Sequence, residues 1–158
     1  MLAFNSYPIL TDGEIDLILE RTFDGIPGTT WSPSYNFKIS LHDKRGKIGN
    51  ISLRIGHTDH LRLYAGHIGY GIDLNHRGHR YAAKACQLVK QVALDHDFSE
   101  VWITCNPENF PSRRTCEIIG AEYVETVDLP SNTEMYRLGE RQKRRYRWII
   151  KSPQTPSQ

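Results

Sequence analysis

The residues best suited to chemistry lie in two segments, 68–82 and 106–121. The first runs from an apolar stretch, residues 68–74, into a turn of asparagine, histidine, arginine and glycine, and then into a helical pattern. A donor-rich turn between a strand and a helix is a place to hold phosphates, because backbone N–H groups point outward there and the helix dipole favours negative charge. This order of features predicts a nucleotide-like ligand at the turn.

The elements that must position these segments can be read from the spacing of apolar residues. Residues 35–41 and 47–55 alternate between apolar and polar types around a turn at 43–46, which predicts an antiparallel hairpin. Thr11 or Asp12 can cap a short helix over 11–20, whose first turn is acidic. The other elements expected are strands over 66–74, 101–105, 122–127, 135–138 and 146–150, a helix from 80 to about 95, and a helix over 111–119 ended by Gly120.

This order places hairpin strands first and strand–helix–strand crossovers after them. It predicts the α/β class, with a single-domain, mixed and mostly antiparallel sheet flanked by helices on both faces. The domain is expected to span residues 1–151. Residues 152–158 are polar and contain proline, and we expect them to form a disordered tail.

The composition narrows the class of protein. Of the 158 residues, 39% are hydrophobic and 24% are charged, which is typical of a soluble globular domain. No apolar run approaches the roughly 20 residues that span a bilayer, and no secretory signal is visible. Three cysteines without CxxC spacing indicate reduced, buried thiols. We therefore expect a cytoplasmic protein with no membrane partner.

The turn Arg77-Gly78-His79-Arg80-Tyr81-Ala82 resembles the acyl-CoA-binding motif of the GNAT superfamily of N-acetyltransferases, Gln/Arg-x-x-Gly-x-Gly/Ala before a long helix. Arg80 stands where the motif has its middle glycine, so it needs a compatible backbone conformation, and its guanidinium can contact phosphate. Residues 106–121 resemble the signature Asn-x-x-Asn-x-x-Ser with a later Gly-Phe, with Ala121 in place of the phenylalanine. The serine variant is similar to the branch that includes ribosomal-protein N-terminal acetyltransferases.

The resemblance implies acetyl-CoA as co-substrate and an amine as acceptor, with direct attack in a ternary complex. It implies that one strand pairs with the pantetheine arm through its backbone, that the turn 77–82 cradles the pyrophosphate, and that polar residues before and on the second helix hold the cofactor. The implied cofactor-binding residues are Ile72, Asp73, Leu74, Arg77, Gly78, His79, Arg80, Tyr81, Ala82, Asn106, Asn109 and Ser112.

Acetyl transfer to an amine also needs a neutral nucleophile and a donor for the departing thiolate. Many superfamily members carry a tyrosine acid four residues before the motif's glycine, but that position here is Cys116, which we interpret as a small core residue. Ser112 is then the preferred donor, and a helix-capping serine is the alternative. His67 is the first candidate for the base, with Glu108, Tyr70 and a base acting through water as alternatives.

Two further features leave alternatives open. The histidine pairs 57/60 and 76/79 have neither helical i, i+4 spacing nor cysteine partners, so we expect no metal site. The basic run 140–147 is interpreted as a solvated turn before an edge strand, although it keeps open a non-catalytic acyl-CoA- or nucleic-acid-binding module. A net charge of +2 is too small to favour nucleic acid as a partner. A homodimer that pairs through strand 146–150 is possible.

Overall fold

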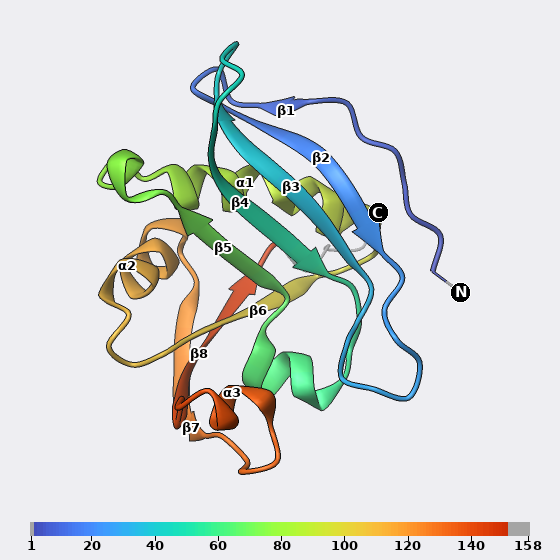
Figure 1. The fold of residues 1–158 in the computed structure, drawn as a ribbon, viewed down its shortest axis with the longest axis vertical. Coiled ribbons are helices and arrows are strands. Elements are labelled where there is room, and N and C mark those ends of the chain that lie inside the picture. Colours follow the sequence, from blue (N-terminus) through green and yellow to red (C-terminus); the bar gives the residue numbers. More distant parts are fainter. Residues whose placement is uncertain (1, 152–158) are drawn as a thin grey trace, which may run out of the picture.

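The computed structural model describes residues 2–151 and consists of two antiparallel sheets with flanking helices (Figure 1). The first sheet has the order β1-β2-β3-β4-β5 and the second has the order β6-β8-β7. The strands are β1 (Leu10–Thr11), β2 (Ile15–Phe23), β3 (Ser34–Leu41), β4 (Lys47–Arg54), β5 (Ile68–Ile72), β6 (Glu100–Cys105), β7 (Glu122–Asp128) and β8 (Gln142–Ile149). The helices are α1 (Tyr81–Asp95), α2 (Phe110–Ile119) and α3 (Glu134–Arg137), with short helical turns at η1 (Leu61–Ala65) and η2 (Leu74–His76).

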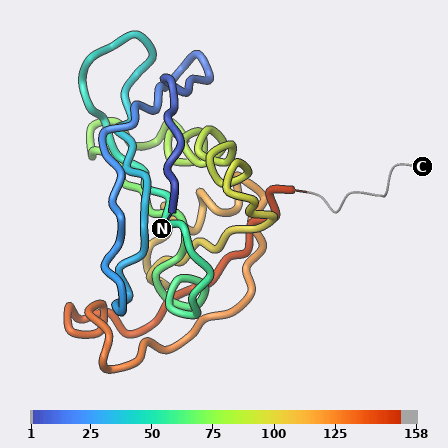
Figure 2. The backbone as a smooth tube through the Cα atoms, turned by 90° about the vertical axis from the view of Figure 1, so that its right-hand side faces the viewer, coloured from blue at the N-terminus to red at the C-terminus, as the bar shows by residue number. Residues whose placement is uncertain are grey.

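The core lies between the first sheet and α1. Alternate residues of β3 and β4, such as Phe37 and Leu53, are fully buried, and they meet an apolar stripe of α1 that includes Val89. The α/β class with antiparallel strands and flanking helices is confirmed. Figure 2 shows α1 and α2 on the same side of the first sheet, and the other side of that sheet carries polar side chains such as Lys38 and Asn50.

Most elements lie close to their predicted positions, including the hairpin of β3 and β4, both long helices, β6 and β7. The left-handed backbone of Gly120, with φ of 83°, ends α2 as expected. None of the helices in residues 2–151 has the length and apolar character needed to cross a membrane. The expected tail, 152–158, lies outside the described residues.

The predicted helix over 11–20 is wrong, because these residues form β1 and the first part of β2. The capping signal is real but serves a turn: the Asp12 carboxylate accepts hydrogen bonds from the N–H groups of Glu14 and Ile15, both at 2.9 Å. Beyond that turn, Ile15 and Leu17 are fully buried as alternate residues of β2 paired with β3. Long-range pairing with β3 therefore overrides the local helical signal.

Two predictions near the C-terminus are also wrong. The expected strand 135–138 is helix α3, which begins where the Thr133 hydroxyl accepts the N–H of Tyr136 at 3.3 Å. The expected edge strand is β8, the central strand of its sheet. β8 pairs with β6 over residues 144–149 and with β7 over residues 142–147, so residues 144–147 have no free edge for pairing with a second copy.

The central position of β8 also explains the basic run. Arg145 pairs with Glu125, and Arg147 lies 3.1 Å from Glu122 on β7. These two arginines therefore pair with acids of the neighbouring strand, and the interpretation of this segment as a solvated turn is wrong for them. Cross-strand pairing of this kind removes much of the positive field that a nucleic acid would need.

Candidate functional site

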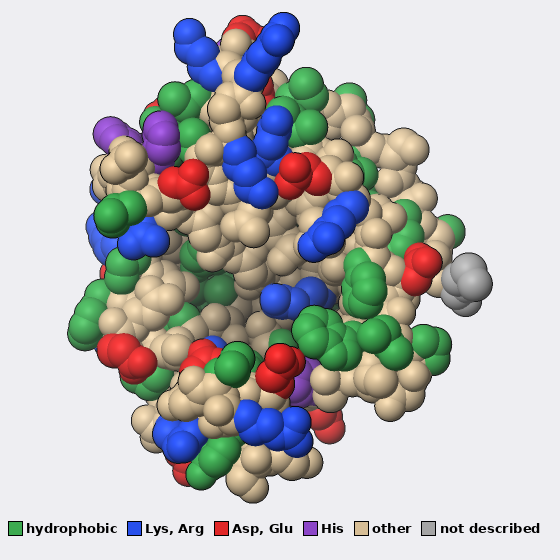
Figure 3. Space-filling model, in the orientation of Figure 1, with side chains coloured by type: hydrophobic (Ala, Val, Ile, Leu, Met, Phe, Trp, Pro, Cys, Tyr) green, Lys and Arg blue, Asp and Glu red, His purple; other side chains and the backbone are tan. Residues whose placement is uncertain are grey.

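A cavity of about 800 Å³ lies where β5 and β6 separate. β5 is the edge of the first sheet and β6 the edge of the second, and they bond at His67, whose N–H donates to the Trp102 carbonyl at 2.7 Å. Beyond that junction the strands diverge, and the first turns of α1 and α2 complete the walls. Figure 3 shows the hollow with an apolar floor and Lys or Arg side chains around it.

Most of the residues expected to bind the cofactor line this one cavity, although 24 or more positions separate the two sequence segments. Three do not line it: Asp73, Leu74 and His79. Those that line it are Ile72, Arg77, Gly78, Arg80, Tyr81, Ala82, Asn106, Asn109 and Ser112.

The outer edge of β5 faces the cavity and pairs with no strand among residues 2–151. The Asp73 N–H donates to the Ile48 carbonyl on β4 at 2.8 Å, and alternate residues of an antiparallel strand bond to the same neighbour. Tyr70 and Ile72 therefore direct their backbone groups away from β4, toward the cavity that they line. Neither Asp73 nor Leu74 extends this edge, because the Asp73 N–H bonds to β4 and Leu74 begins η2.

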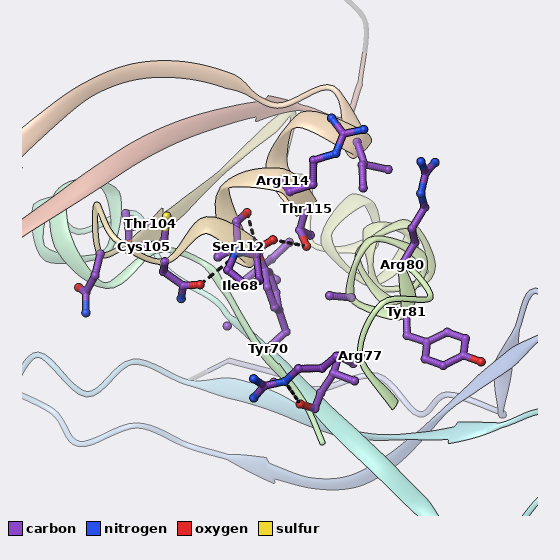
Figure 4. A pocket seen from close by; sticks show the side chains of 18 of the residues that line it. Ile68, Tyr70, Arg77, Arg80, Tyr81, Thr104, Cys105, Ser112, Arg114 and Thr115 are labelled. Carbon is purple, nitrogen blue, oxygen red and sulfur yellow. Dashed lines mark hydrogen bonds between the residues drawn. The ribbon is translucent and has the colours of Figure 1, made fainter. Parts of the chain in front are cut away.

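The turn before α1 presents a row of backbone donors. Within residues 2–151, no backbone or side-chain acceptor meets the N–H groups from 78 to 83, and the first turn of α1 contains no acid. Gly78 and Arg80 have φ values of 91° and 63°, and this left-handed geometry turns successive N–H groups to one side. Arg77 fixes the start of the turn by donating from Nε to the Ile72 carbonyl at 2.9 Å (Figure 4). Backbone donors, a helix N-terminus and arginine side chains therefore lie together here, and each of them stabilises a bound anion.

The two asparagines of the second segment differ in their contacts. The Asn109 side chain accepts the N–H of Ser112 at 3.2 Å and so caps α2. The Asn106 Oδ1 is buried and has no hydrogen-bond partner among the described residues, although it lines the cavity. A buried acceptor of this kind needs a partner, which a ligand with an N–H group supplies.

Ser112 and Tyr70 meet at the cavity floor. Their hydroxyl oxygens lie 2.8 Å apart, and Figure 4 shows Tyr70 reaching from β5 toward Ser112 on α2. Cys116 lies below them, fully buried, and burial raises the pKa of its thiol to about 12. Cys116 is therefore a protonated core residue.

His67 has a structural position that argues against its role as the base. Its Nε2 donates to the Gly56 carbonyl at 2.9 Å, and its Nδ1 accepts the N–H of Trp102 at 2.9 Å. Burial lowers its pKa to about 4, and the side chain does not line the cavity. Glu108 is exposed and is also absent from the lining.

Three charged residues at the other end of the cavity were missed by the sequence analysis: Arg54, Glu140 and Lys143. Glu140 is the one acid among the lining residues, and it lies 2.9 Å from the Lys143 ammonium. Burial raises the pKa of Glu140, but hydrogen bonds from Lys143 and Asn106 outweigh burial and lower it. The alternation of 143, 145 and 147 in a strand-forming run was the available signal, and it was interpreted as a turn.

One cluster of potential metal ligands occurs among residues 2–151, formed by Asp16, His42 and Asp43. It lies at the end of the β2–β3 pair, away from the cavity lining. The His42 Nδ1 is 2.8 Å from the Asp16 carboxylate, and the Asp43 N–H also donates to Asp16. These bonds account for the cluster without an ion.

The sequence matches the family model of the acetyltransferase (GNAT) domain over residues 6–122. No curated protein sequence matches the chain. A GNAT-family acetyltransferase from Bacillus anthracis superposes with a TM-score of 0.58 at 22% identity, covering 73% of this chain and 66% of that one.

Two other solved structures share the fold. The ribosomal-protein-S5-alanine acetyltransferase from Vibrio fischeri has a TM-score of 0.60 at 14% identity, covering 77% of this chain and 64% of that one. RimJ of Mycobacterium smegmatis, solved with CoA-disulfide, has a TM-score of 0.57 at 19% identity, with coverage of 77% and 56%. The chain thus spans between 56% and 66% of the length of these three proteins.

Proposed function

Because this chain belongs to the GNAT acetyltransferase family, we propose that it transfers an acetyl group from acetyl-CoA to a primary amine. The proposed reaction is direct attack of the amine on the thioester in a ternary complex, with no covalent acetyl-enzyme. The structural neighbours include ribosomal-protein acetyltransferases and a protein solved with CoA-disulfide, which supports a CoA thioester as donor.

The observation that carries the proposal is the row of unpaired N–H groups at residues 78–83. Four residues of this row line the same cavity as Arg77 and Arg114, namely Gly78, Arg80, Tyr81 and Ala82. A pyrophosphate is an anion of matching charge, and it satisfies several neighbouring donors at once. The edge of β5 at Tyr70 and Ile72, which no described strand pairs, and the Asn106 Oδ1, which has no partner in residues 2–151, continue from this end toward the middle of the cavity. An amide-containing arm requires such groups.

In this proposal acetyl-CoA supplies an activated acetyl group, and the chain's residues position it. The turn 77–82 holds the phosphates, β5 and Asn106 hold the pantetheine amides, and the Ser112 hydroxyl stabilises the thiolate. The acceptor enters from the end lined by Arg54 and Glu140. Since the pKa of Glu140 is lowered, its carboxylate stays ionised beside Lys143 and accepts a hydrogen bond from the acceptor amine, which loses its proton to water before attack.

A calorimetric titration with acetyl-CoA tests the donor. We expect saturable binding with a Kd on the order of micromolar, and weaker binding of dephospho-CoA. An absence of heat at millimolar acetyl-CoA, with a folded protein, would contradict the proposal.

Turnover is tested separately by the release of CoA thiol in the presence of a panel of amines: amino acids, polyamines, aminoglycosides and short peptides with free N-termini. Glu140→Gln should raise the KM for the best acceptor and leave acetyl-CoA affinity unchanged. Lys44→Gln, in the exposed turn after β3, is the control for a change of one surface charge. Thiol release that no amine accelerates would reject the transferase activity while keeping the donor site.

A further inference from the structure

The contact between Tyr70 and Ser112 joins two elements that are 42 residues apart. Tyr70 rises from β5 and Ser112 occupies the first turn of α2, so the hydrogen bond crosses the floor of the cavity between its two walls. Ser112 has only 8% of its surface exposed, and bulk water therefore competes weakly for its hydroxyl. The contact fixes a hydroxyl inside the cavity and not on a free surface.

Either hydroxyl can donate in this contact, and we take Tyr70 as the donor. The Tyr70 hydroxyl has two acceptors within reach, the Ser112 Oγ at 2.8 Å and the Ser112 carbonyl at 3.5 Å. The first is an ordinary O–H···O distance and the second is at the outer limit, so Oγ is the better acceptor for the Tyr70 proton. Because a serine hydroxyl has one proton and accepts through its lone pairs, with Tyr70 as donor Ser112 keeps its own proton for another acceptor.

The Cys105 thiol is a neighbour of Ser112. Burial raises the pKa of the Cys105 thiol, and the neighbouring Ser112 hydroxyl acts in the opposite direction. Cys105 and Ser112 both line the cavity, so a ligand there lies within reach of the Ser112 hydroxyl. Burial also raises the pKa of Tyr70 well above its ordinary value, which keeps Tyr70 a donor throughout the working range.

We propose that Tyr70 is a positioning residue that directs the Ser112 hydroxyl at the sulfur of the departing CoA, an inference that rests on the proposed function. In the reaction the amine nitrogen forms a bond to the acetyl carbon, the C–S bond breaks, and its electron pair goes to sulfur. The amine proton leaves to water. The thiolate is held by the Ser112 O–H and takes a proton from water on release.

The test is the acidity of CoA bound to the protein, measured by the ultraviolet absorbance of its thiolate during a pH titration. The wild-type protein should lower the thiol pKa of bound CoA, because a donated hydrogen bond stabilises the charged form. Ser112→Ala should return it by about 1 to 2 pH units toward the value of free CoA. Tyr70→Phe should return it in part, and Tyr70→Phe with Ser112→Ala should match Ser112→Ala alone.

The controls separate this inference from the proposed function. Tyr123→Phe removes a hydroxyl from an exposed tyrosine on β7 and should leave the thiol pKa unchanged. CoA that binds with the same thiol pKa in wild type and Tyr70→Phe would overturn the positioning role and keep the donor site. Additive effects in the double variant would also overturn it, since Tyr70 would then act without Ser112. A wild-type protein that does not bind CoA would instead overturn the proposed function.

Discussion

Arg80 and Asp97 lie at opposite ends of α1 and share a left-handed backbone, with φ values of 63° and 65°. Residues other than glycine pay roughly 1 to 2 kcal/mol for this conformation. At Asp97 it ends the helix in an exposed turn, which is a common use. At Arg80 it begins the helix beside the cavity, where glycine is the residue of the family motif. The chain therefore accepts backbone strain at a position where the side chain can contact an anion.

This relationship predicts opposite effects on stability and binding. Arg80→Gly should raise the free energy of unfolding by about 1 kcal/mol and weaken CoA binding about tenfold, because it relieves the backbone and removes the guanidinium. Arg80→Ala should weaken CoA binding to the same extent and leave the free energy of unfolding unchanged, because alanine keeps the backbone strain. Asp97→Gly, the matched control, should stabilise without affecting CoA. Urea unfolding and calorimetry measure both quantities, and unchanged CoA affinity in Arg80→Gly would show that the backbone alone holds the anion.

A second prediction concerns Gly49, which sets the spacing of β4 and β5. A Cβ built there would lie 2.3 Å from the Gly71 carbonyl oxygen, a backbone atom that cannot move without shifting β5. Gly49→Ala should destabilise the protein by about 1 to 3 kcal/mol and weaken CoA binding, since β5 forms the cavity edge. Gly46→Ala is the control, because no heavy atom lies within 4 Å of its added Cβ. Equal unfolding midpoints for the two variants would mean that β5 adjusts freely.

The sequence was most informative for parts of the site that are built from residues close together in the chain. The turn 77–82 carries its glycine, its arginines and its helix start within six residues, so its role as a donor-rich turn could be predicted from neighbours in the chain. The cap at Asn109 and the stop at Gly120 are local in the same sense. Each depends on backbone geometry that a few adjacent residues determine.

What could not be predicted depends on partners far away in the sequence. β2 forms because β3 pairs with it and buries Ile15 and Leu17, and the acidic turn before it looked like a helix start. The Tyr70–Ser112 hydrogen bond and the place of Glu140 in the cavity require the two sheets to be assembled. Patterns of single segments contain no information on which strand edges meet.

The buried His67 predicts how stability depends on pH. Burial lowers its pKa from the ordinary 6.5 to about 4, so the folded state favours the neutral ring. Its contribution is fully present above pH 6.5 and is lost as the pH falls from 6.5 toward 4, by about 3 kcal/mol in total. His67→Gln offers a donor and an acceptor that do not titrate, and should flatten this part of the curve. Urea unfolding at a series of pH values measures the slope.

His42 provides the contrast for that experiment. The Asp16 carboxylate accepts its hydrogen bond and raises the pKa of His42, so its contribution is present at low pH and is lost as the pH rises above 6.5. His42→Gln should therefore change the curve on the neutral side, and it should also change the acid side where Asp16 titrates, because the hydrogen bond from His42 lowers the pKa of Asp16. A wild-type slope between pH 4 and 6.5 that persists in His67→Gln would contradict the assignment of this titration to His67.

The three thiols predict a chemical footprint of the donor site. Cys86 and Cys116 are fully buried, whereas Cys105 is 4% exposed and lines the cavity. Burial raises the pKa of each thiol, so iodoacetamide should modify the folded protein slowly, at Cys105 first. CoA should slow that reaction by covering the cavity, and Cys105→Ser should remove it while the urea-unfolded wild type labels at all three positions. Peptide mass spectrometry measures each site, and labelling of Cys105 at one rate with and without saturating CoA would place the bound cofactor elsewhere.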